Sequence, residues 1–125
     1  MNEKSFEIEV IFQHEATEAV LSTLKEADAR NVVRGDEHGF LGIGEAILGT
    51  VLAHSLIKLI SRLIQLWKCG VIVDARKPKL VVEKNCELPR GSVLILNADG
   101  TQATLHKVTE EQLKVKLGKL VDISV

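Results

Sequence analysis

The chain of 125 residues carries a formal net charge of −1, with 46% hydrophobic and 26% charged residues. This length and composition fit one globular domain, residues 1–125, and exclude a disordered or fibrous chain. The near-neutral charge supplies no basic field, and three phenylalanines and one tryptophan leave few rings to stack on bases, so nucleic acid is not expected as a partner.

The first predicted elements are a strand, a helix and a second strand. Apolar residues alternate with two glutamates over residues 6–12, which is typical of a strand with one buried face. Residues 15–29 place alanine, valine and leucine at helical spacing, with glutamates early, where the helix dipole favours anions. The apolar run at 31–34 predicts a short second strand before a polar loop at 35–39.

The longest apolar run, residues 42–68, predicts one long α-helix around which the domain is organised. Such a helix would be roughly 40 Å long, which exceeds the width of a small domain. Apolar residues cover most of its circumference, so it must be covered on more than one side. Gly49 and Ala53 lie four residues apart and would let another backbone approach one face closely.

Beyond this run the periodicity becomes strand-like and predicts two hairpins. Residues 71–75 and 80–83 flank a turn with proline, and residues 92–96 and 102–106 flank a turn with the sequence Asp-Gly. A capping box then predicts a short helix over residues 109–119. The expected fold class is α+β: a mostly antiparallel sheet with one long apolar helix and two shorter helices packed on it.

The two cysteines, Cys69 and Cys86, lie beside predicted strands with no second pair to complete a metal site. They are predicted to be reduced thiols in the core. The first ten residues lack the apolar run and cleavage site of a signal peptide, so the cytoplasm is the expected location.

No group of residues predicts enzyme activity, a metal or a cofactor. Asp36, Glu37 and His38 are potential metal ligands, but adjacent residues do not easily all face one ion, and no spaced pair of ligands completes a site. There is neither a Gly-x-Ser-x-Gly elbow nor a cysteine with a histidine nearby in sequence. A metal-dependent enzyme built on residues 36–38 is the least favoured alternative.

Several pieces of the chain together resemble a family of small bacterial proteins, the effector-associated constant components of conflict and defence systems. They are the apolar, glycine-containing run at 42–67, the strand-like Val71-Ile72-Val73, and the stretch from 91 to 101 with its Asp-Gly turn. The family consists of short α+β chains. The resemblance implies a non-enzymatic accessory module, encoded beside an effector such as a protease or nuclease, that recruits, scaffolds or regulates it.

The predicted function is therefore a non-enzymatic interaction module that associates with itself and recruits or regulates a larger effector. The residues expected to make these contacts lie on the long helix and on the first hairpin: Gly49, Ala53, Leu56, Ile60, Leu63, Trp67, Arg76 and Lys77. The alternative is a membrane-active effector whose helix at 42–68 inserts into or lies on a membrane after activation. It is less favoured, because charged residues interrupt any span of the roughly 20 residues needed to cross a bilayer.

Overall fold

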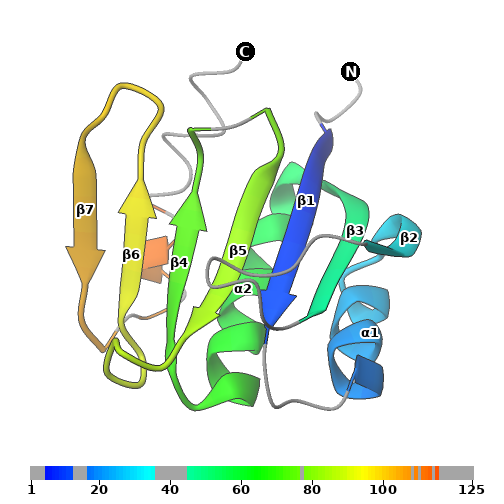
Figure 1. Ribbon diagram of the computed structural model, residues 1–125, viewed down its shortest axis with the longest axis horizontal. Coiled ribbons are helices and arrows are strands. Elements are labelled where there is room, and N and C mark those ends of the chain that lie inside the picture. The colour runs from blue at the N-terminus through cyan, green and yellow to red at the C-terminus, as the bar shows by residue number, and fades with distance from the viewer. Residues whose placement is uncertain are drawn as a thin grey trace.

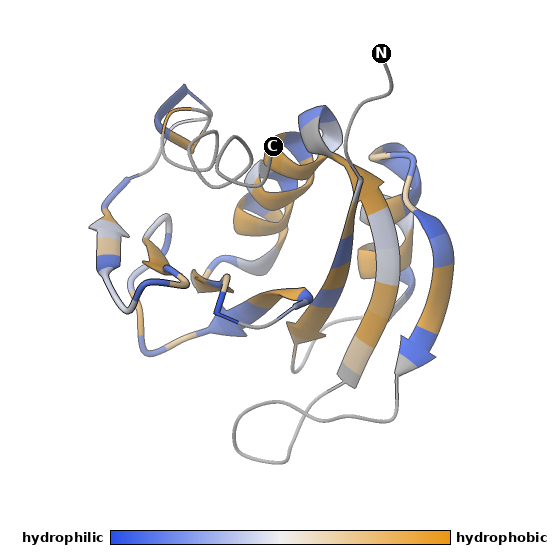
Figure 2. Cartoon of the chain, turned by 90° about the horizontal axis from the view of Figure 1, so that it is seen from above, coloured by the Kyte–Doolittle hydropathy of each residue, from blue (hydrophilic) through white to orange (hydrophobic). Residues whose placement is uncertain are grey.

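The computed structural model describes residues 5–12, 17–35, 45–76, 78–107, 109, 111–113 and 115. Its elements, in chain order, are β1 (Ser5–Phe12), α1 (Thr17–Glu26), β2 (Arg30–Gly35), β3 (Glu45–Leu52), α2 (Ala53–Trp67), β4 (Gly70–Asp74), β5 (Leu80–Asn85), β6 (Val93–Leu96) and β7 (Gln102–Leu105). The strands form one sheet in the order β2-β3-β1-β5-β4-β6-β7 (Figure 1). Helices α1 and α2 lie on the same face of this sheet (Figure 2).

The N-terminal half is a split β-α-β unit. The chain runs from β1 through α1 to β2, and β3 then lies between these two strands and is antiparallel to both. In the C-terminal half, the two predicted hairpins, β4–β5 and β6–β7, are confirmed. Parallel pairs join β1 to β5 and β4 to β6, so the sheet is mixed. The α+β class is confirmed.

The prediction of one long apolar helix over residues 42–68 is wrong. Residues 45–52 form strand β3, and α2 comprises only Ala53–Trp67. Strand β3 pairs with β1 on one side and with β2 on the other. Its backbone groups therefore form hydrogen bonds across the sheet, and its side chains alternate between the two faces. A continuous apolar run is compatible with a buried strand as well as with a buried helix. The apolar spacing therefore predicted a helix where residues 45–52 form a strand.

The core fills the space between the sheet and the two helices. Leu59, Ile60 and Leu63 of α2 are fully buried there, together with Val20 and Leu24 of α1. The sheet contributes the side chains that point toward the helices: Ile8, Val10, Phe12, Ile47, Val51, Val71, Val73, Val82, Val93 and Ile95. The apolar side of α2 is therefore covered by the chain's own sheet.

Two short motifs take the conformation that their residues predict. In the β6–β7 turn, the backbone N–H and the hydroxyl of Thr101 donate to Asp99 Oδ1 at 2.9 and 2.6 Å, and these bonds lower the pKa of Asp99 below its usual value. Gly100 has a φ of 90°, the left-handed geometry that glycine tolerates. The capping box is confirmed by reciprocal bonds between Thr109 and Gln112, each made by a backbone N–H to the other's side chain.

Replacing Gly70 by alanine should destabilise the protein, because a Cβ built at this position would overlap the Cβ of Leu88. Leu88 would have to move its backbone, and overpacking of this kind costs about 1–3 kcal/mol. Chemical denaturation measures the loss. Gly49→Ala is the matched control, since its nearest contact would be an ordinary 3.5 Å to Val32. Equal stability of the two variants would contradict the packing described for Gly70.

Candidate functional site

The structure separates the residues predicted to form an interaction surface. Four of them, Leu56, Ile60, Leu63 and Trp67, are at most 3% exposed and pack in the core. Gly49 lies in β3 opposite Ile8, and Ala53 is the first residue of α2. Lys77 lies outside the described residues. These positions do not share one exposed surface in the described part of the chain.

Arg76 is exposed but is held by an ion pair with Asp74. Its Nε and Nη2 atoms donate to the two carboxylate oxygens at 2.9 Å each, and its backbone N–H donates to Oδ1 at 3.0 Å. The hydrogen bonds and the negative charge of Asp74 raise the pKa of Arg76 above its usual value. This two-point pairing directs the guanidinium to Asp74 at the end of β4, so Arg76 is a poor candidate for binding a partner.

The outer strand β2 offers the best-placed surface for a partner in the part of the chain that the structure describes. We call Arg30, Asn31, Val33 and Arg34 of this strand the β2 edge. β2 is the first strand in the sheet order, so one side of its backbone faces away from β3. Val33 is 54% exposed, and among the described strands it is the one large apolar side chain that is exposed. An outer strand with an exposed apolar side chain can accept another extended segment.

The start of the β2 edge is irregular. The register with β3 shifts between Arg30 and Val33, and Asn31 has a φ of 55°, an uncommon left-handed conformation for a residue other than glycine. Asp28, just before the strand, has a φ of 57°. Irregularities of this type redirect side chains and recur at binding sites.

A cavity of about 270 Å³ lies beside this irregular segment. Its lining combines charged and polar side chains with two apolar residues of β3: Ser5, Asp28, Arg30, Asn31, Thr50, Val51 and Leu52. The cavity and the β2 edge share Arg30 and Asn31. Together they present an extended backbone, an apolar anchor and a cationic side chain, the elements of a peptide-binding edge.

The prediction that Cys69 and Cys86 are reduced core thiols is wrong. The two residues form a disulfide, with their Cα atoms 4.7 Å apart. Cys69 is half-buried and Cys86 is exposed. The sequence shows only that the cysteines are 17 positions apart; the hairpin between β4 and β5 brings them together.

The described residues contain no group of three or more histidine, cysteine, aspartate or glutamate side chains placed to hold a metal ion. The potential ligands at 36–38 lie outside the described residues. In the same described part, no helix is long and apolar enough to cross a membrane. The predicted helix at 42–68, on which a membrane-active function depended, is replaced by β3 and the shorter α2.

Sequence reasoning missed the β2 edge because it predicted the strand without its position in the sheet. The available signal was an apolar pair, Val32 and Val33, between two arginines, a composition common in outer strands. Comparison of the chain with protein-family models, curated proteins and solved structures found no match.

Proposed function

We propose that this protein is a non-enzymatic interaction module that binds a larger effector protein through the β2 edge. The observation that supports the proposal is the exposed Val33 on an outer strand, beside a cavity of mixed polar and apolar lining that reaches Arg30. An extended segment of the partner would add to the sheet beyond β2. Backbone hydrogen bonds would supply affinity, and the Val33 and Arg30 side chains would select the segment.

A larger partner suits this edge better than a second copy of the chain. An antiparallel pair of β2 strands centred on Val32 would set Arg30 opposite Arg34 of the second copy, and like charges at opposed positions destabilise a pair of strands. The predicted association through α2 is also unsupported, because its apolar side chains pack within the chain. Self-association is therefore not part of the proposal.

The resemblance to effector-associated components supports the proposed partner. It implies that the effector is encoded beside this chain, and such an effector is the first partner to test. The cytoplasm remains the proposed compartment, where an accessory module would meet an effector made from an adjacent gene.

The test is co-purification of the chain with the product of the adjacent gene after co-expression. Val33→Lys should reduce the amount of bound partner by about tenfold. The substitution places a charged ammonium where the apolar Val33 side chain would contact the partner, and loss of one well-packed contact commonly weakens binding by about this factor. The bound fraction is measured by quantitative gel densitometry or mass spectrometry.

Thr104→Lys is the matched control, because Thr104 is an exposed residue of β7, the outer strand at the opposite side of the sheet. It should bind the partner as the unmodified chain does. Thermal melting of both variants checks that they are folded. Equal loss of binding in both variants, or undiminished binding by folded Val33→Lys, would refute the β2 edge as the binding surface.

A further inference from the structure

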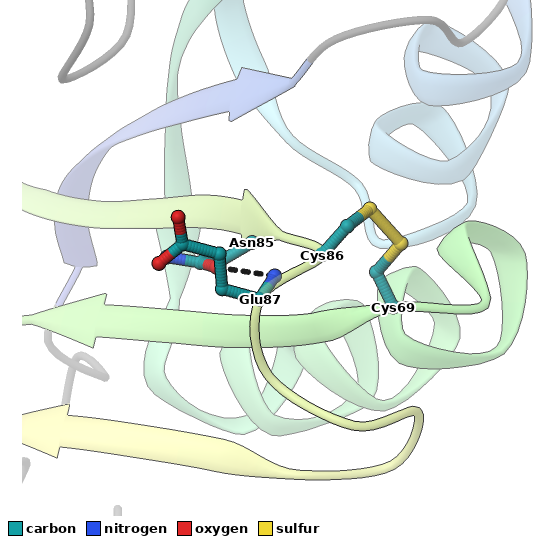
Figure 3. Close-up of a disulfide and its surroundings, with 4 residues drawn as sticks. All are labelled: Cys69, Asn85, Cys86 and Glu87. Carbon is teal, nitrogen blue, oxygen red and sulfur yellow. Dashed lines mark hydrogen bonds between the residues drawn. A yellow bond between two sulfur atoms is a disulfide. The ribbon is translucent and has the colours of Figure 1, made fainter.

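The disulfide occupies a defined position in the sheet. Gly70 of β4 pairs with Asn85 of β5, and the next position outward on each strand is Cys69 and Cys86. The bond therefore links directly opposed residues just beyond the ladder of the β4–β5 hairpin (Figure 3). The Cα separation of 4.7 Å is close to that of an opposed pair without backbone hydrogen bonds in an antiparallel ladder.

The surrounding backbone is held by contacts that do not involve sulfur. The N–H of Gly70 donates to the carbonyl of Leu88 at 3.2 Å, and the N–H of Leu88 donates to the carbonyl of Asn85 at 3.3 Å. The N–H of Glu87 donates to Asn85 Oδ1 at 2.8 Å (Figure 3). These bonds form a turn that lies against the start of β4.

The strands joined by the disulfide do not depend on it for their place in the fold. β4 lies between β5 and β6, and β5 lies between β1 and β4, so each has a partner on both sides. Val73 and Val82, which pair within the hairpin, are fully buried in the core. Loss of the disulfide should therefore loosen the turn at 85–88 and leave the rest of the sheet in place.

We propose that Cys69–Cys86 is a thiol–disulfide exchange site for an external dithiol. Cys86 is exposed, so its sulfur is the accessible point of attack. The thiolate of the dithiol attacks Cys86 Sγ, a mixed disulfide forms, and Cys69 leaves as a thiolate that takes up a proton. The second thiol of the reductant then attacks the mixed disulfide, which releases Cys86 as a thiol. The dithiol is oxidised to its disulfide, and the protein gains two electrons and two protons.

Reduction of the disulfide would change the structure locally, at the end of the β4–β5 hairpin. Cys69 directly follows Lys68, the left-handed residue that ends α2, so the oxidised bond ties the end of this helix to the end of β5. Reduction removes that tie. In a reducing compartment such as the cytoplasm, the disulfides that proteins form are usually transient and redox-sensing. This inference does not rest on the β2 edge.

The test exposes the oxidised full chain to dithiothreitol without denaturant, then labels thiols with a maleimide and counts labels by mass spectrometry. Two labels per chain are expected after reduction, because the sequence contains two cysteines, and none before it. Hydrogen exchange of the Gly70 and Leu88 amides should become faster by about tenfold or more, and by a larger factor than any rise at Val73 and Val82, where exchange follows the global stability. Fluorescence of Trp67, the single tryptophan, gives a second readout two residues from Cys69.

Single variants test which sulfur is attacked. In Cys69→Ser the remaining Cys86 should react with the maleimide faster than the remaining Cys69 does in Cys86→Ser, because only Cys86 is exposed. The double variant Cys69→Ser/Cys86→Ser should take no label and should not respond to dithiothreitol in hydrogen exchange. Labelling before reduction, labelling that requires guanidinium, or exchange that rises equally across the sheet would each overturn the proposal.

Discussion

Leu63→Ala is expected to lower the free energy of unfolding by about 2–5 kcal/mol, the usual cost of removing a buried leucine side chain and leaving part of its cavity. Leu63 is fully buried between α2 and the sheet. Chemical denaturation followed by circular dichroism measures the change. The substitution keeps good helix propensity, so the loss reports packing rather than helix formation.

Gln65→Ala is the control for this experiment, because Gln65 lies two residues along the same helix and is exposed. It should change the free energy of unfolding by no more than about 0.5 kcal/mol. A small effect for Leu63→Ala, together with a change in the solution mass of the protein, would show instead that this side of α2 meets another molecule. That outcome would restore the interaction surface predicted from the apolar run.

The double variant Cys69→Ser/Cys86→Ser should be less stable than the oxidised protein by about 3 kcal/mol, the loop-closure value for cysteines this far apart in the chain. The bond closes a segment with a sequence separation of 17, and most of its effect lies in restricting the unfolded chain. Thermal or chemical denaturation of the oxidised protein and the double variant measures the difference.

Dithiothreitol supplies the control for the second prediction. It should lower the stability of the unmodified protein toward that of the double variant and should leave the double variant unchanged. A double variant as stable as the oxidised protein would mean that the disulfide does not restrict the unfolded chain. A double variant that is less stable but still folded would show that the sheet persists without the disulfide.

Local patterns predicted several elements because the physics behind them is local. The alternation in residues 6–12 produces β1, and the spacing in residues 15–29 contains α1. The Asp-Gly turn and the capping box form because their bonds join residues two or three positions apart. Such contacts need no information about the rest of the fold.

The apolar run at 42–68 shows where local information ends. Its composition satisfies both a buried helix and a buried strand, and only the neighbouring strands decide between them. β1 and β2 flank residues 45–52 and satisfy their backbone groups on both sides, so this part joins the sheet. α2 starts where that pairing stops and places its apolar side over the same sheet.

The candidate sites could be located only in the tertiary structure, whereas several helices and strands could be predicted from the sequence. The sequence determined that the chain is α+β with two hairpins, because composition and short-range periodicity carry that information. Only the strand order placed Val33 on an outer strand, and only the register of β4 with β5 set Cys69 opposite Cys86. Both facts arise from pairing between segments distant in sequence, which no local pattern specifies.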